Sequence, residues 1–156
     1  MAKVFLCYRS RDDGFAAVLL DEKLSGAFGP DEVFMASRSI EPGEIYSAVI
    51  ERALKECETM LVLIGPRWVD TLQENEADAA AGTVDWVRHE ISTAFANGTR
   101  VIPLLLSRTP RLDPHLLPSD IAALADYKYL TFDHRNVSGS LNQIIAALQT
   151  GDRARR

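Results

Sequence analysis

The chain has 156 residues, of which 47% are hydrophobic and 25% charged, a composition typical of one globular domain with a sizeable core. A formal net charge of −5 gives no broad cationic field, which argues against binding to nucleic acid or to an anionic membrane. No apolar run approaches membrane-spanning length, so the expected location is the cytoplasm. Cys7 and Cys57 do not have metal-site spacing, and we expect two buried free thiols and no metal.

The first part of the chain alternates short apolar runs with amphipathic segments. Residues 3–8, 32–36 and 60–64 are predicted to be strands, and the first of them is expected to be the central strand of a sheet. Helices are predicted over 14–28, after capping residues at 10–13, and over 45–57. The side chains expected on the buried faces of these two helices are Phe15, Val18, Leu19 and Leu24 in the first, and Ile45, Val49, Ala53 and Leu54 in the second.

The second part begins with an acidic, alanine-rich segment, 71–83, for which a solvated surface loop is favoured over a short helix. A helix is predicted over 84–98, ending at Asn97-Gly98. The remaining predicted segments are a strand over 101–106, an extended Pro-rich connection over 107–119, a strand over 127–132 and a helix over 138–148. The domain is expected to span 1–149, followed by a disordered tail or linker over 150–156.

Five strands that alternate with helices predict a three-layer α/β sandwich with a parallel sheet, because each parallel crossover needs a covering helix. Ligands of such sheets gather at the carboxyl ends of the strands. The loops expected to form a site are therefore 8–13, 36–44 and 65–83.

Trp86 and Glu90 lie four residues apart in the predicted helix 84–98 and so share one face. That face flanks an apolar stripe, which places an indole and a carboxylate side by side at the rim of the core. The spacing alone is weak evidence, since a helix-flank tryptophan beside a solvated glutamate is common. His89 would point away from the stripe, and we expect it to be exposed.

The order and spacing of these segments resemble the Toll/interleukin-1 receptor (TIR) domain, a flavodoxin-like module of innate-immune receptors and bacterial defence proteins. Residues 4–9, Val-Phe-Leu-Cys-Tyr-Arg, are similar to the first strand of the family, and 33–45 to its second strand and BB loop. Residues 60–66 and 100–106 are similar to its third and fourth strands. The resemblance covers roughly residues 3–149.

Within the family, Trp86-Val-Arg-His-Glu90 resembles the Trp-x-x-x-Glu helix of bacterial and animal members that cleave NAD⁺. The resemblance implies that Glu90 is the catalytic carboxylate and that NAD⁺ is a substrate, with no cofactor. It also implies that the side chains bordering the substrate are Tyr8, Arg9, Glu41, Ile45 and Trp86. Two departures bear on these contacts, since Cys7 stands where many members have Ser, and Ala36 where many have Asp.

The chemistry of NAD⁺ explains how one carboxylate could suffice. Nicotinamide leaves as a neutral molecule, so no general acid is required, in contrast to ordinary glycosidases. Glu90 would stabilise the oxocarbenium-like ribose, and Trp86 or Tyr8 would offer an aromatic face. Three arginines in the strand-end loops could meet the pyrophosphate, or each could be a solvated surface residue, namely Arg9, Arg11 and Arg38.

Two functions compete at this point. The first is an NAD⁺ glycohydrolase or ADP-ribosyl cyclase, activated by self-association with other TIR domains in immune defence or signalling, with a sensor domain or protein as a further partner. The second is a non-catalytic TIR–TIR interaction module in which Glu90 is incidental. A receiver-type signalling domain is disfavoured, because Tyr8-Arg9-Ser10 stands where an acidic cluster would be needed.

Overall fold

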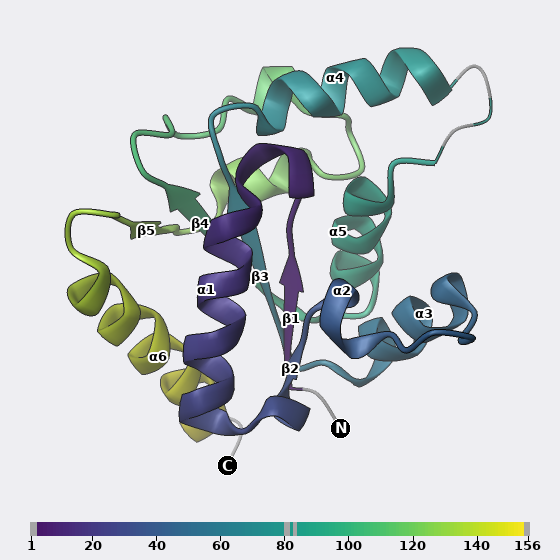
Figure 1. Ribbon diagram of the computed structural model, residues 1–156. Helices are drawn as coiled ribbons and strands as arrows, with labels where there is room; N and C mark the ends of the chain where they lie inside the picture. Colours follow the sequence, from purple (N-terminus) through teal and green to yellow (C-terminus); the bar gives the residue numbers. More distant parts are fainter. Residues whose placement is uncertain (1–2, 80–81, 83, 155–156) are drawn as a thin grey trace.

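The computed structural model describes residues 3–79, 82 and 84–154. Within these residues, five strands form one parallel sheet in the order β2-β1-β3-β4-β5 (Figure 1). The strands are β1 Val4–Cys7, β2 Val33–Phe34, β3 Thr59–Ile64, β4 Arg100–Leu106 and β5 Leu130–Phe132. The predicted parallel α/β sandwich is confirmed. The prediction that the first strand is central was wrong, because β1 pairs with β2 and β3, and β3 occupies the middle of the sheet.

Helices cover both faces of the sheet (Figure 1). Helices α1 (Ser10–Phe28) and α6 (Val137–Ala154) pack on one face, and α3 (Tyr46–Glu56) and α5 (Trp86–Ala96) on the other. Side chains alternate along β1, so that Leu6 joins the core under α1 while Cys7 joins the core under α5. This alternation directs Cys7 toward the helix that carries Glu90.

Helix α1 buries only part of the predicted face, because Leu24 is buried and Leu19 partly buried as expected, but Phe15 and Val18 are not. Phe15 is 91% exposed and Val18 56% exposed, whereas Ala17, Leu20 and Leu24 are fully buried. Ala17, Leu20 and Leu24 follow one another at intervals of three and four residues and form a continuous stripe. The prediction went wrong because it followed the larger side chains of Phe15 and Val18 instead of the small alanines that pack closest to the sheet.

The segment between β2 and α3 is only partly the loop that was predicted. Ala36–Ser39 form a short helix, α2, followed by a turn at Gly43, whose φ of 92° favours glycine. Ile45 was predicted to face the core, but it is the N-cap residue of α3 and is 71% exposed. The buried stripe of α3 begins one turn later, at Ile50.

The acidic segment favoured as a loop contains a helix, α4 (Trp68–Ala79), near the carboxyl ends of the strands (Figure 1). Trp68 and Leu72, four residues apart, are completely buried and anchor it to the core. Of the remainder of this segment, residues 80, 81 and 83 lie outside the described residues.

The C-terminal part matches the predicted order of elements with shifted boundaries. The Pro-rich connection contains two short 3₁₀ helices, η2 (Pro114–Leu116) and η3 (Ala122–Asp126), and β5 begins three residues later than predicted. Helix α6 continues to Ala154, so the tail predicted to be disordered from Thr150 is helical up to that residue, and 155–156 lie outside the described residues. In the described part of the chain, no helix is both long and apolar enough to cross a membrane.

Candidate active site

Helix α5 carries the two residues of the predicted motif. Its N-cap is Asp85, whose side chain accepts a hydrogen bond from the backbone N–H of Arg88 at 3.4 Å. Trp86, in the first turn, is half-buried, and Glu90, one turn further, is only 8% exposed. The helix therefore presents the indole near the surface and holds the carboxyl group behind it.

The carboxyl group of Glu90 lies beside the buried thiol of Cys7. Burial is the main cause that raises the pKa of Glu90 to about 8, and the negative charge of Asp85 adds to the increase. A hydrogen bond with Cys7 and the positive charge of Arg9 act in the opposite direction and lower this pKa. Burial and Glu90 in turn raise the pKa of the Cys7 thiol well above its ordinary value. A buried carboxyl group whose pKa is shifted toward neutrality is a common feature of catalytic sites.

Aromatic rings pack around Trp86, one helical turn before Glu90. The ring of Trp86 makes edge contacts with Tyr46 at 6.2 Å and with His89 at 5.6 Å between centroids. Burial is the larger cause and the negative charge of Glu90 the second cause that raise the pKa of Tyr46, so the hydroxyl of Tyr46 is influenced by Glu90. His89, predicted to be exposed, is partly buried and bonds to Glu51 on α3.

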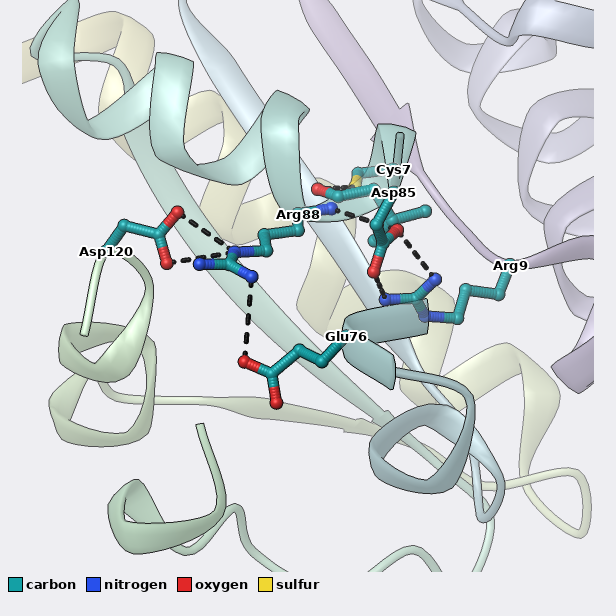
Figure 2. A network of polar contacts seen from close by, with 7 residues as sticks. Cys7, Arg9, Glu76, Asp85, Arg88 and Asp120 are labelled. Atoms are coloured by element: carbon teal, nitrogen blue, oxygen red, sulfur yellow. Dashed lines mark hydrogen bonds and ion pairs between the residues drawn. The ribbon is translucent and has the colours of Figure 1, made fainter. Parts of the chain in front are cut away.

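Arg9 and Asp85 form a buried ion pair that fixes the start of α5. Arg9 donates from Nη1 and Nη2 to the two oxygens of Asp85 at 3.0 and 2.9 Å (Figure 2). The guanidinium carbon lies 5.2 Å from the centre of the Trp68 ring on α4. Burial acts to raise the pKa of Asp85, but the hydrogen bonds and charge of Arg9 outweigh it and lower that pKa. Arg9 Nε is buried and has no hydrogen-bond partner among the described residues.

A cavity of about 420 Å³ opens where β1, α4 and α5 meet. Among its lining residues are Tyr8 and Arg9 after β1, Thr71 and Asn75 on α4, and Trp86 on α5. Glu90 does not line it and lies one turn below Trp86. The cavity lies at the carboxyl end of β1, next to the point where the strand order reverses between β1 and β3, the usual ligand position in open parallel sheets.

A family model described as "TIR domain" matches residues 4–145, which is most of the chain. The chain belongs to the TIR domain family. The resemblance to this family and the flavodoxin-like fold predicted from it are therefore confirmed.

Solved structures with the same fold agree with this assignment. The TIR domains of the activated Roq1 resistosome, which directly recognises the pathogen effector XopQ, are 15% identical with a TM-score of 0.68, covering 95% of this chain and 99% of theirs. The TIR domain of the Toll-related receptor TRR-2 from Hydra magnipapillata is 17% identical with a TM-score of 0.64, covering 96% and 99%. A metazoan TIR-STING receptor from C. gigas, in complex with 2',3'-cGAMP, is 18% identical with a TM-score of 0.58, covering 89% of this chain and 38% of that one.

The site residues predicted for this TIR domain fall into two groups. Tyr8, Arg9 and Trp86 line one cavity, and Glu90 is buried one helical turn after Trp86 on α5. Tyr8 also donates from its hydroxyl to Ser37 Oγ at 3.1 Å, which brings α2 to the same side of the sheet.

The second group does not line this cavity. Arg38 donates from Nε and Nη2 to the carboxylate of Asp21 on α1, at 2.6 and 2.8 Å, and to the backbone oxygen of Val33 at 2.7 Å. Its guanidinium therefore connects α2 to α1. Glu41 and Ile45 are exposed on the turn before α3.

Two residues of this candidate site were not predicted from the sequence. Asp85 directly precedes Trp86, and aspartate is a residue type typical of an N-cap. Its partner Arg9, however, is 76 positions away, and no local pattern in the sequence indicates the pair. Tyr46 follows Ile45 in a run of exposed residues, and only the packing of α3 beside α5 brings its ring to Trp86.

Proposed function

We propose that this TIR domain is an NAD⁺ glycohydrolase that breaks the bond between nicotinamide and ribose. The observation that supports the proposal most is the buried carboxyl group of Glu90, one helical turn after Trp86, which lines a cavity at the carboxyl end of β1. The family assignment is consistent with this activity and leaves it to be tested.

The proposed reaction uses Glu90 as an anion. The C–N bond to the ribose breaks, its electron pair leaves with nicotinamide as a neutral molecule, and the positive charge that develops on the ribose is stabilised by the carboxylate. Water then attacks the ribose and loses a proton to the solvent to give ADP-ribose, or a nitrogen of the adenine attacks and the adenine loses a proton to give a cyclic product. With a pKa of about 8, Glu90 is largely protonated at neutral pH in the free protein, and the positively charged nicotinamide ring of bound NAD⁺ would favour its ionised form.

Two further groups are suited to hold the substrate. Arg9 lines the cavity, and its Nε is a buried donor without a partner in the described residues, which leaves one N–H for a phosphate oxygen of NAD⁺. Tyr8 and Trp86 line the same cavity and offer rings against which a nicotinamide or adenine can pack. The protein would need no further cofactor, because the reaction transfers no electrons.

Activation by self-association forms part of the proposal. Glu90 is nearly inaccessible in the single chain, so a change at Trp86 or Tyr46 is needed to admit the ribose. A second TIR domain that packs on segment 41–48, which joins the turn before α3 to the first residues of that helix, would contact Tyr46 directly. Such coupling would suit a cytoplasmic defence protein that responds to a sensor domain or protein.

A second function, a non-catalytic TIR–TIR interaction module, is supported by the same segment. Residues 41–48 are all exposed, and they include Ile45 at 71% and Tyr46 at 50%. Adjacent exposed apolar side chains are typical of a surface that another protein covers. In this case, Glu90 would be a buried structural residue and no nicotinamide would be released.

The deciding experiment is incubation of concentrated protein with NAD⁺ and chromatographic analysis of nicotinamide and its co-product. We expect release by the wild type and loss of at least about a hundredfold in Glu90→Gln, which removes the charge and keeps the shape. The matched control is Glu56→Gln, an exposed glutamate on α3, which should retain full turnover. Turnover by a folded Glu90→Gln protein would exclude the carboxylate from the reaction, and a silent wild type under assembling conditions would favour the interaction module.

A further inference from the structure

The carboxyl ends of β4 and β5 enclose another cavity, of about 310 Å³, which shares no lining residue with the cavity beside Trp86. Its polar lining residues are Ser107, Arg108, Thr109, Thr131, Asp133, His134 and Arg135. Loops at the carboxyl ends of parallel strands are the usual source of ligand-binding groups in this class of sheet. The proposed NAD⁺ chemistry uses none of these residues.

The lining of this cavity carries more positive than negative charge. Arg108 and Arg135 contribute two guanidinium groups, and neither makes an ion pair within the described residues. Asp133 is the one carboxylate among the lining residues, and one of its oxygens accepts the backbone N–H of Arg135 at 2.9 Å. The two guanidinium groups are therefore available to an anion, for which bidentate hydrogen bonds are the preferred geometry.

Hydroxyl groups complete the polar lining. Ser107 Oγ accepts the backbone N–H of His134 at 2.9 Å, contacts its ring Nδ1 at 2.6 Å and donates to the carbonyl of Phe132 at 3.2 Å. Ser107 thus joins the ends of β4 and β5 and fixes the imidazole. Thr109 Oγ1 is buried and has no hydrogen-bond partner among the described residues, so it can donate to a ligand oxygen.

The backbone at Arg108 adopts a conformation that arginine rarely takes. Its φ is 62°, and it occupies the third position of a turn closed by the N–H of Thr109 and the carbonyl of Leu106 at 2.9 Å. Glycine or asparagine is favoured at such a position. An arginine in this backbone conformation costs the fold stability. Its place at the rim of a polar cavity is therefore more simply explained by a role in binding a ligand.

We propose that this cavity binds the phosphate group of a small phosphate monoester, such as a sugar phosphate. Arg108 and Arg135 would hold the phosphate oxygens, and the buried hydroxyl of Thr109 would donate to one of them. The volume suits a phosphate with a small sugar, and the lining hydroxyls match sugar hydroxyl groups. The site is separate from NAD⁺ cleavage and would be present whether or not the domain is an enzyme.

The test is a titration of ¹⁵N-labelled protein, followed by NMR, with inorganic phosphate and with ribose 5-phosphate in chloride buffer of constant ionic strength. We expect saturable shifts centred on the amides of Thr109, His134 and Arg135, with tighter binding of ribose 5-phosphate. The variants Arg135→Gln and Arg108→Asn should each raise Kd at least tenfold. Because asparagine tolerates a positive φ, Arg108→Asn should lose binding without a lower melting temperature.

The control is Arg111→Gln, which makes the same change of charge at an exposed arginine of the same connection that does not line the cavity. Its Kd should remain within twofold of the wild type. Equal weakening by all three variants would show general attraction of anions, and would overturn the proposal. So would the absence of saturable shifts, shifts centred elsewhere, or binding of inorganic phosphate without binding of ribose 5-phosphate.

Discussion

The carboxyl group of Glu90 is buried between α5 and β1, and its pKa is raised from an ordinary value of 4.5 to about 8. The folded protein therefore holds this proton more tightly than the unfolded chain does. The stability that results is fully present below pH 4.5 and is lost as the pH rises through about 8. A charged Glu90 without its substrate is thus a destabilising group at alkaline pH.

Glu90→Gln should accordingly alter how stability depends on pH. Glutamine imitates the protonated acid, so the melting temperatures of variant and wild type should be close near pH 4.5 and diverge in favour of the variant up to about pH 8. Each kcal/mol of difference corresponds to about 2–4 °C in a domain of this size. Scanning calorimetry at several pH values measures the difference, with Glu56→Gln as the control for the same change at an exposed glutamate. Parallel curves for Glu90→Gln and wild type would mean that Glu90 ionises as readily in the folded state as in the unfolded chain.

At the scale of the elements, α5 is held in place by contacts of unequal strength at its first turn. The ion pair between Arg9 and Asp85 is buried, with side chains 5% and 9% exposed. Arg88 instead donates from Nε to both oxygens of Asp120, at 3.1 and 3.0 Å (Figure 2). Its Nη1 also lies 3.6 Å from Oε1 of Glu76 on α4, and both contacts are on the surface. The ion pair of Arg9 and these contacts of Arg88 tie α5 to neighbouring segments, but only the ion pair of Arg9 leaves an isolated buried charge when it is broken.

Asp85→Asn should therefore lower the free energy of unfolding by about 3–5 kcal/mol, because Arg9 would keep its charge without a partner. Arg88→Gln should cost at most about 1 kcal/mol, since its partners remain in contact with water. Urea titration followed by circular dichroism gives both values. Equal small losses would indicate that water reaches Arg9, contrary to its burial. In Asp85→Asn, we also expect reduced nicotinamide release, because the helix that carries Glu90 loses its anchor.

The elements and the site differ in how far they could be predicted from the sequence. Helix α5 was predicted because its apolar stripe and its terminal Asn97-Gly98 are local signals. Helix α4 was missed because its fully buried side chains, Trp68 and Leu72, lie near its start, and most of its other residues are polar. The spacing of Trp86 and Glu90 along one helix was visible in the sequence, whereas the burial of Glu90 against Cys7 depends on how β1 and α5 pack together.

At the scale of the whole molecule, the exposed segment 41–48 is the surface for which we predict self-association. Ile45→Ser should raise the dissociation constant of the assembly by roughly tenfold or more, since apolar anchors dominate such interfaces. Specific NAD⁺-cleaving activity, which should rise with protein concentration in the wild type, should become low and flat. Sedimentation and nicotinamide release over a wide concentration range measure both effects.

The control for this prediction is Leu116→Ser, which removes an exposed leucine from η2, outside that segment. It should leave both assembly and activity unchanged. An Ile45→Ser protein that still assembles and cleaves NAD⁺ like the wild type would show that segment 41–48 is not the surface of self-association.

The position of β1 inside the sheet also governs the order in which the chain can fold. Its residues Val4–Cys7 pair with β2 on one side and with Thr59–Val62 of β3 on the other, so the first described strand stays incomplete until β3 has formed. The long loop between β1 and β3 must close before these strands can pair. Closing it costs conformational entropy that no contact yet offsets, and this cost slows folding. During synthesis, the edge of β1 that pairs with β3 would remain without its partner until the third strand has left the ribosome, which makes this unpaired edge a target for chaperones.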